Sequence, residues 1–168
     1  MRILRKIDNH IEEWILVFLL AVSLTSITLQ IFMRFIFDNS LSWSEELARY
    51  CFIWLIYIGI AYGVKLSRHI TLDVVYDLVP DTLKKAFQLL SNLLVGAFAL
   101  IVIYNSYFLI DQLASFGQTS AAMRLNMVYV YLSVPIGMAL TIIRLIQNTI
   151  YIIKNGISDL MEDKGGIM

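Results

Sequence analysis

Three polar side chains near the middle of the chain have a spacing that can hold a metal ion. His69, Asp73 and Asp77 follow one another at intervals of four residues, so a helix would place them on one face. Apolar residues occupy the adjacent face, namely Ile70, Val74 and Leu78. Imidazole and carboxylate groups bind divalent metal ions, but this spacing is a weak pattern, and a solvated face of an amphipathic helix accounts for it better. We therefore predict no metal site here.

A second group of charges stands at the start of an apolar run, in the sequence SWSEELARYCFIW at residues 42–54. Arg49 follows Glu45 by four residues and Glu46 by three, so either carboxylate can reach the guanidinium along one helix. Ser42 precedes Glu45 by three residues, which is the spacing of a capping box. The second apolar helix is therefore predicted to start just after Ser42.

The chain carries none of the common catalytic motifs. HExxH, GxSxG, a Walker loop and CxxC are absent from its sequence. The single cysteine, Cys51, has no histidine near it in sequence and falls in an apolar run, where a free cysteine acts as a small apolar residue. We therefore expect no enzymatic activity, no cofactor and no disulfide within the chain.

Composition places the chain in a membrane. Of its 168 residues 59% are hydrophobic and 15% are charged, whereas soluble domains have about 45–50% apolar and about 25% charged residues. The formal net charge is zero, so nothing attracts the chain to nucleic acid. Four runs are long enough to cross a bilayer, at approximately 14–33, 43–64, 87–110 and 127–147. We predict an all-α integral membrane protein, with residues 1–168 forming a single membrane domain surrounded by lipid.

Lysines and arginines predict the orientation of the spans. Nine of the thirteen lie at the N-terminus, between the second and third spans, and at the C-terminus. Three lie on the opposite side: Arg34, Arg49 and Arg124. Cytoplasmic segments carry the excess of positive charge, so both termini are predicted to be cytoplasmic and residues 34–46 and 111–126 to face outward. The remaining arginine, Arg144, is expected to extend from the fourth span to the inner headgroups, and the amphipathic segment to lie on the inner membrane surface.

Two interpretations of the charged helix start remain open. A capped helix end at the membrane interface explains Trp43 and Glu45, because indole rings anchor there and the helix dipole favours early acidic residues. It explains Arg49 and Tyr50 less well, since both lie further along the apolar run. A contact with another helix or another protein explains them, and Arg34, at the end of the preceding run, is a candidate partner for one glutamate.

Small and polar residues within the spans indicate close helix packing. Gly59 and Gly63 have the four-residue spacing that lets two helices approach. Stripes of polar or small residues follow one face of the other spans: Ser23, Ser26, Gln30 and Arg34; Asn92, Gly96 and Ala99; Ser133, Gly137 and Thr141. Contacts inside a four-helix bundle and an interface with a partner both explain these stripes. Pro135 is expected to kink the fourth span or open a gap in its backbone hydrogen bonds.

The chain resembles a known family of membrane subunits. The stretch RFIFDNSLSWSEELARYxFIWLxYxGxA at residues 34–61, which includes Trp54, resembles the signature of the small membrane subunit of TRAP (tripartite ATP-independent periplasmic) transporters, the DctQ family. His69 and Asp73 match the HxxxD pattern of this family. The sequence VPIG at residues 134–137 resembles its fourth span.

The resemblance implies a part in secondary transport in bacteria. In TRAP systems a periplasmic solute-binding protein delivers an organic acid, commonly a C4-dicarboxylate or a sialic acid, to a complex of a small and a large membrane subunit. A sodium gradient drives import, and the large subunit holds the substrate and sodium sites. The resemblance thus implies an inner-membrane protein that braces the large subunit and helps to dock the solute-binding protein.

The residues expected at these contacts are polar, aromatic and small positions: Gln30, Arg34, Trp43, Glu45, Glu46, Arg49, Tyr50, Trp54, Gly59, Gly63, His69, Asp73, Pro135 and Gly137. Two other functions remain open. A self-sufficient small transporter built as a homo-oligomer would need an ionisable residue in mid-span, and the sequence has none. A membrane-embedded enzyme or sensor would need a clustered polar site or an output domain. The sequence does not identify the solute, because the selecting residues are expected in the other two proteins.

Overall fold

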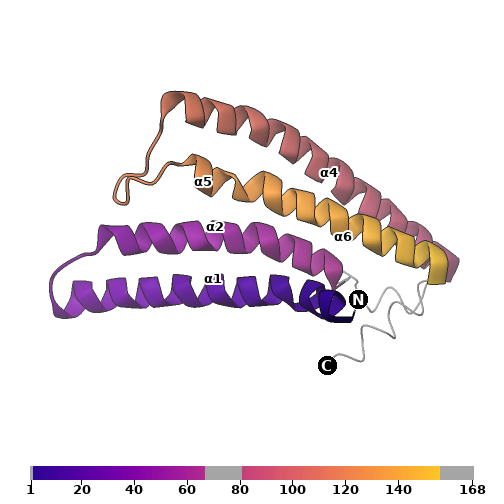
Figure 1. Cartoon of the computed structure of the whole chain (residues 1–168), viewed down its shortest axis with the longest axis horizontal. Coiled ribbons are helices and arrows are strands. Elements are labelled where there is room, and N and C mark those ends of the chain that lie inside the picture. Colours follow the sequence, from indigo (N-terminus) through magenta and orange to yellow (C-terminus); the bar gives the residue numbers. More distant parts are fainter. Residues whose placement is uncertain (1, 67–80, 156–168) are drawn as a thin grey trace.

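The structure, a computed structural model, describes residues 2–66 and 81–155. The described residues form five helices: α1 (Arg2–Ile36), α2 (Ser42–Lys65), α4 (Asp81–Phe116), α5 (Val128–Tyr131) and α6 (Ser133–Asn155) (Figure 1). Within these ranges, Thr119 and Asn126 also form an isolated antiparallel β-bridge. The predicted amphipathic segment, with His69 and Asp73, lies outside the described residues.

Four stretches of these helices are long and apolar enough to cross a membrane: Ile11–Ile36, Ser42–Lys65, Leu83–Phe116 and Val128–Lys154. Their number confirms the predicted all-α membrane class. Helix α4 is longer than its predicted span, since it runs on to Phe116. Its 36 residues measure about 54 Å at 1.5 Å per residue, and a hydrocarbon core is about 30 Å thick. Helix α4 must therefore tilt or project from the bilayer.

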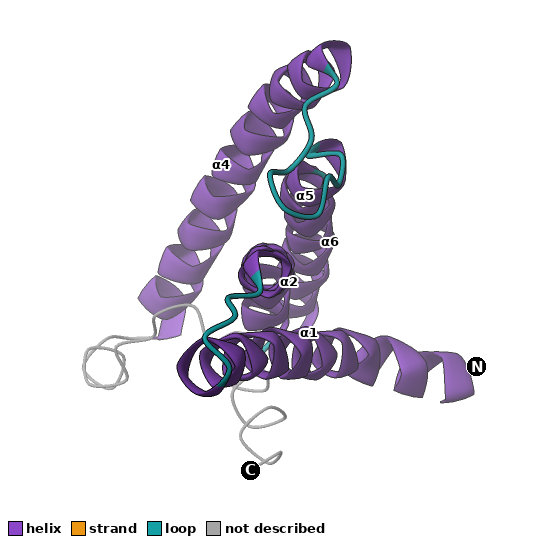
Figure 2. Ribbon diagram, turned by 90° about the vertical axis from the view of Figure 1, so that its left-hand side faces the viewer, coloured by secondary structure: helices purple, strands orange, loops and turns teal. Residues whose placement is uncertain are grey.

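The helices form an open row in the order α1, α2, α6, α4 (Figure 1). Helix α2 packs against α1 on one side and α6 on the other, and α6 packs against α4. Figure 2 shows α4 leaning away from α1, with α2 and α6 between them. Residues 37–41 and 117–127 connect the helices at the same end of the row, which we call the loop end.

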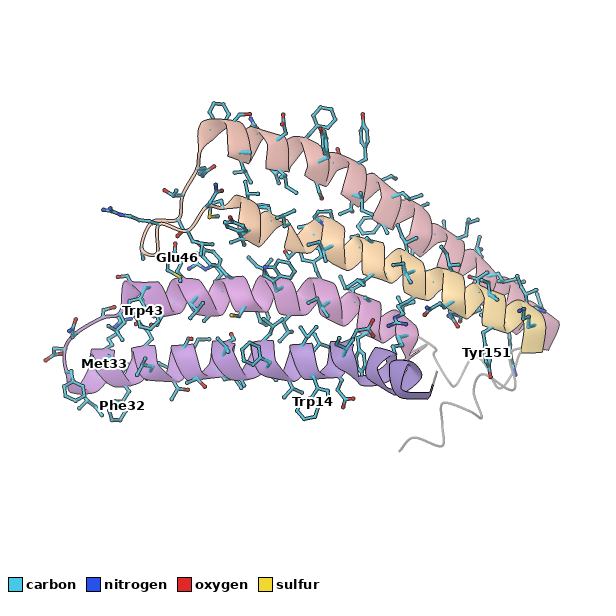
Figure 3. All side chains as sticks on the ribbon, in the orientation of Figure 1. Trp14, Phe32, Met33, Trp43, Glu46 and Tyr151 are labelled. Atoms are coloured by element: carbon cyan, nitrogen blue, oxygen red, sulfur yellow. The ribbon has the colours of Figure 1, made fainter. Side chains whose placement is uncertain are left out.

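The middle of the row holds the tightest packing. Ala61 and Val64 of α2 and Ser133 and Thr141 of α6 are fully buried. The outer helices α1 and α4 instead expose large apolar side chains along most of their length. Trp14 of α1 is 72% exposed and points away from α2 (Figure 3). Such exposed apolar faces are stable in contact with lipid or with another membrane protein.

Two local predictions can be compared with the backbone. The prediction of a capping box at Ser42 is wrong. Helix α2 begins at Ser42 itself, and its N-cap residue is Leu41, which makes no side-chain hydrogen bond to the helix. The break expected near Pro135 is present, since α5 and α6 are separated at Leu132. Proline has no N–H, so the carbonyl oxygen of Tyr131 loses its helical partner there.

Candidate functional site: polar contacts between the helices

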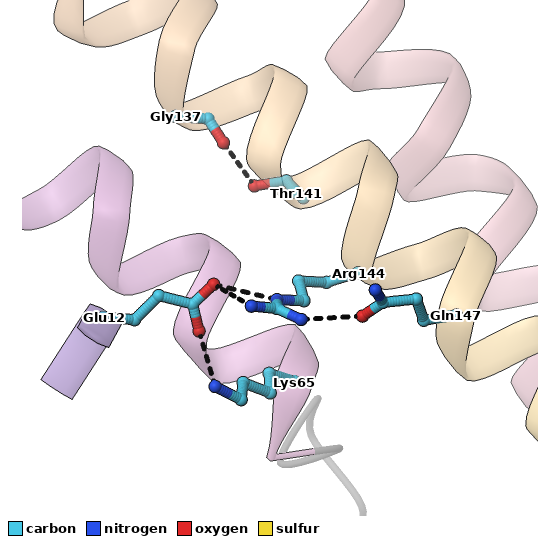
Figure 4. A network of polar contacts seen from close by, with 6 residues as sticks. All are labelled: Glu12, Lys65, Gly137, Thr141, Arg144 and Gln147. Atoms are coloured by element: carbon cyan, nitrogen blue, oxygen red, sulfur yellow. Dashed lines mark hydrogen bonds and ion pairs between the residues drawn. The ribbon is translucent and has the colours of Figure 1, made fainter. Parts of the chain in front are cut away.

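The most buried charges of the described chain join three helices at the end opposite the loops. Glu12 of α1 lies between Arg144 of α6 and Lys65 of α2 (Figure 4). Its Oε1 atom accepts from Nε of Arg144 at 2.8 Å and lies 2.8 Å from Nη2, and its Oε2 atom lies 3.1 Å from Nζ of Lys65. The side chains of Glu12, Arg144 and Lys65 are 4%, 9% and 16% exposed.

The position of Arg144 corrects a prediction. Its side chain is buried between helices and not exposed, and its Nη1 donates to Oε1 of Gln147 at 2.8 Å. A buried guanidinium is stable only when it is paired and hydrogen-bonded, and the Glu12 carboxylate supplies the counter-charge. Sequence reasoning missed this cluster. The signal that could have found it was the presence of opposite charges at the predicted cytoplasmic ends of the first, second and fourth spans.

Serine and glutamine side chains of α1 bind α2 toward the loop end. The Gln30 amide donates from Nε2 to Oγ of Ser40 at 2.9 Å, and its Oε1 accepts from Oγ of Ser44 at 2.8 Å. Deeper along the same face, Oγ of Ser23 donates to the Ala48 carbonyl at 3.2 Å. Ser23 and Gln30 belong to the polar stripe of the first span, so this part of the stripe makes contacts inside the chain. Arg34, the last member of the stripe, is exposed.

Glu46 binds the segment that connects α4 to α5. Its carboxylate accepts four hydrogen bonds at 2.8–3.1 Å, from Oγ of Ser120 and the backbone N–H groups of Ala121, Ala122 and Met123. Figure 3 shows Glu46 on α2, directed toward this loop. Turns expose N–H groups that lack partners within the turn, and a carboxylate satisfies several of them at once. Glu46 thus ties the first turns of α2 to the connection at residues 117–127.

The other residues of the charged helix start lie differently. Trp43, Glu45 and Arg49 are exposed. Among the described residues, Arg49 forms no ion pair with either glutamate. Tyr50 turns toward the loop, where its hydroxyl lies 3.6 Å from Sδ of Met127. Trp54 is partly buried on the same helix.

Helices α2 and α6 approach each other closely at Gly137. A Cβ atom added to Gly137 would lie 2.5 Å from Cβ of Tyr57 and 2.8 Å from its backbone carbonyl, so only glycine fits here. By contrast, a Cβ at Gly59 would lie 3.8 Å from Leu16 of α1, and one at Gly63 would meet nothing within 4 Å. The two glycines of α2 therefore do not make the close contact, although their spacing suggested it.

The polar stripe of the third span joins α4 to α6. Asn92 of α4 donates from Nδ2 to Oγ1 of Thr149 at 3.1 Å, and both Asn92 and Ala99 are buried. Thr141 of the fourth-span stripe is also buried, where its hydroxyl donates to the Gly137 carbonyl at 2.9 Å (Figure 4). The Thr141 bond stays within α6, whereas the bond from Asn92 to Thr149 crosses between helices and is of the kind that holds membrane helices together.

The arrangement of these groups defines a class of protein. No group of three or more histidine, cysteine, aspartate or glutamate side chains in the described ranges could hold a metal ion. Several buried polar groups instead pair across helix contacts, as Glu12 does with Arg144 and Asn92 with Thr149. The fold is that of a multi-pass α-helical membrane protein whose polar side chains bind its helices together.

Comparison with known proteins identifies the family. The chain belongs to the DctQ component of the tripartite ATP-independent periplasmic transporters, whose family profile matches residues 12–155. This confirms the family predicted from the sequence, and it places the chain among transporter subunits of the bacterial inner membrane. The matched range includes all three members of the buried charge cluster.

Three relatives illustrate the match. Over 81 residues the chain is 40% identical to the sialic acid TRAP transporter small permease protein SiaQ of Vibrio cholerae, covering 48% of this chain and 47% of that protein. Over 99 residues it is 26% identical to the C4-dicarboxylate TRAP transporter small permease protein DctQ of the same species, covering 59% and 43%. Over 106 residues it is 29% identical to the isethionate TRAP transporter permease protein DctMQ of Oleidesulfovibrio alaskensis, covering 63% and 17%. The chain thus spans less than half the length of each.

Proposed function

We propose that this chain is the small membrane subunit of a sodium-driven TRAP importer of an organic acid. It binds the large membrane subunit, which carries the solute, and helps to dock a periplasmic solute-binding protein. The observation that carries this proposal is the family match over residues 12–155. The names of the relatives favour a sialic acid or a C4-dicarboxylate as the solute.

The fold supports a bracing role. Four spans are locked by the Glu12 cluster at one end, by Glu46 at the loop end and by the Gly137 contact between α2 and α6. An open row of this kind has two broad apolar faces, and it can lie along a larger membrane protein as a rigid unit. Arg34, Trp43 and Glu45 are exposed at the loop end, and we assign them to contacts with a partner protein.

We further propose that the loop end is periplasmic and that both termini are cytoplasmic. The excess of lysine and arginine on the termini and on the segment between α2 and α4 supports this orientation. In this orientation Glu46, Arg34 and Glu45 lie on the side from which a solute-binding protein approaches.

Reconstituted vesicles test the function. Proteoliposomes are made with this chain alone, with its large subunit, and with the large subunit plus the solute-binding protein. Uptake of labelled sialic acid and labelled succinate is measured with and without an inward sodium gradient. We expect sodium-dependent uptake of one solute class only when all three proteins are present. Sodium-dependent uptake by this chain alone would overturn the proposal and favour a self-sufficient homo-oligomeric transporter.

A further inference from the structure

A cleft of about 690 Å³ opens between α2, the α4–α5 loop and the start of α6. It is bounded on the loop side by the Glu46 contact with residues 120–123, and on the other side by the close approach of Tyr57 to Gly137. The break between α5 and α6 lies beside it, in the same stretch that supplies one wall.

The lining of the cleft changes from polar to apolar along α2. Its loop side carries polar groups: Glu46, Arg49, Tyr50, Gln118, Thr119 and Ser120. Further along, the lining is mainly apolar: it includes the aliphatic side chains of Ile53, Ile56, Val130 and Val134, together with Met127, Tyr57 and Tyr131. The cleft therefore offers a charged mouth and a hydrocarbon interior, which suits an amphiphile and not a fully soluble ligand.

Arg49 supplies the charge at the mouth of the cleft. It is exposed, and none of the described carboxylates forms an ion pair with it. The nearest acid in the lining, Glu46, has both oxygens engaged by the loop. Side chains on a helix tilt toward its N-terminus, which here is the loop end. The guanidinium is thus free to bind an anion from outside the chain.

The dimensions of the cleft match one leaflet of a bilayer. Glu46 and Tyr57 are eleven residues apart on α2, which is about 16 Å at 1.5 Å per residue. Half of a hydrocarbon core measures about 15 Å. Arg49 lies less than one turn from Glu46 in the direction of Tyr57, and its side chain tilts back toward the loop end. Its charge therefore stands at the depth of the headgroups when the aliphatic walls stand at the depth of the acyl chains.

We propose that an anionic phospholipid of the loop-end leaflet binds in this cleft, with its phosphate on Arg49 and one acyl chain between Ile53 and Val134. Arginine suits a phosphate because its planar guanidinium donates two parallel hydrogen bonds. Phosphatidylglycerol is preferred to phosphatidylcholine, whose own ammonium group offsets the charge of its phosphate.

Lipid retention tests the site. The full chain is purified in detergent, supplied with phosphatidylglycerol or phosphatidylcholine, and analysed by native mass spectrometry for lipid that stays bound. We expect one retained phosphatidylglycerol and weaker retention of phosphatidylcholine. Arg49→Gln should lower retention roughly tenfold or more, because charge-assisted hydrogen bonds to the phosphate are lost.

Matched variants separate the site from general effects. Arg34→Gln removes another exposed arginine near the loop end that does not line the cleft, and it should retain lipid as the wild type does. Val134→Trp fills the aliphatic wall and should lower retention although Arg49 is intact, whereas Val17→Trp on the exposed face of α1 should not. Arg49→Lys keeps the charge and should retain an intermediate amount. Circular dichroism and gel filtration show whether Arg49→Gln folds. If it does not, Arg49→Lys still tests the site.

Three results would overturn the proposal. Equal retention by the wild type and by well-folded Arg49→Gln would show that the lipid binds elsewhere. Equal thermal stabilisation by inorganic phosphate and by phosphatidylglycerol would indicate a site for free phosphate. No retained lipid, together with loss of the large subunit from affinity-purified Arg49→Gln complexes, would show that protein occupies the cleft. The last result leaves the proposed transport function intact, so the two proposals fail separately.

Discussion

Glu12 is the residue on which the packing of three helices depends. One carboxylate contacts two cations, so its removal takes from both Arg144 and Lys65 the acidic group that lies against them. Removing one member of a buried pair is costly, because the charges that remain have lost both their partner and their water.

We expect Glu12→Gln to lower the free energy of unfolding by about 3–5 kcal/mol. Glu13→Gln, at the exposed neighbouring position, is the matched control and should change it by less than about 0.5 kcal/mol. Both are measured by unfolding in mixed micelles, followed by tryptophan fluorescence. Equal stability of the two variants would show that the cluster contributes nothing.

The contacts of Glu46 show that part of the charged start of the second span makes a contact within the chain. Its carboxylate binds the loop at residues 120–123 and does not pair with Arg49. Three backbone N–H groups and one hydroxyl donate to it. The neighbouring Glu45 faces away on the exposed side of the helix. Two adjacent glutamates therefore have different environments.

Replacing Glu46 by alanine should free the loop without unfolding the helices. The backbone N–H groups of Ala121, Ala122 and Met123 lose their acceptor, so their hydrogen exchange should become faster. Exchange measured by mass spectrometry on peptides covering residues 117–127 tests this. Glu45→Ala is the control and should exchange like the wild type; the same rates in Glu46→Ala would contradict the assigned contact.

At the scale of the elements, the contact between α2 and α6 determines the middle of the row. Backbone meets backbone where Gly137 faces Tyr57, and no side chain intervenes. Small residues permit this approach, and the many short-range contacts it allows stabilise the helix pair. The cleft opens on the loop side of this contact because the helices separate beyond it.

Gly137→Ala should push α2 and α6 apart, since its methyl group would overlap the backbone of Tyr57. The expected cost is about 1–3 kcal/mol, as for other overpacked contacts. Gly63→Ala is the matched control, because its methyl group would meet nothing within 4 Å. Thermal unfolding of both variants measures the difference. An unchanged midpoint in Gly137→Ala would show that the helices are further apart than described.

At the scale of the whole molecule, the open row explains why so much apolar surface is exposed. A closed four-helix bundle would cover one side of every helix, whereas here α1 and α4 each pack against a single neighbour through most of their length. Lipid or a partner subunit must cover the rest. The same arrangement keeps the two connections that the structure describes, residues 37–41 and 117–127, at one end, so the orientation of the row can be tested at a few positions.

Cysteine labelling in intact cells tests that orientation. In a Cys51→Ser background, single cysteines at Ser40 and Thr119 should react with an impermeant thiol reagent, because both positions are exposed at the loop end. A cysteine at Lys154, exposed at the opposite end, should react only after the membrane is permeabilised. Labelling of Lys154→Cys alone in intact cells would reverse the proposed orientation.

Sequence by itself determined the membrane class, the four spans and the family. These follow from local quantities: the length of each apolar run, the scarcity of charge within it and the motif at residues 34–61. The polar stripes and the break near Pro135 were also visible, because helix periodicity and the missing proline N–H are local properties.

Only the tertiary structure decided which of these residues meet. Glu12 and Arg144 are 132 positions apart, and no spacing rule relates residues on helices whose order in space, α1, α2, α6, α4, differs from their order in the chain. For the same reason the sequence did not indicate that Glu46 would bind a loop and leave Arg49 free, or that Gly137 and not Gly59 would make the close contact. Which groups pair depends on helix rotation and crossing, which arise from packing over the whole row.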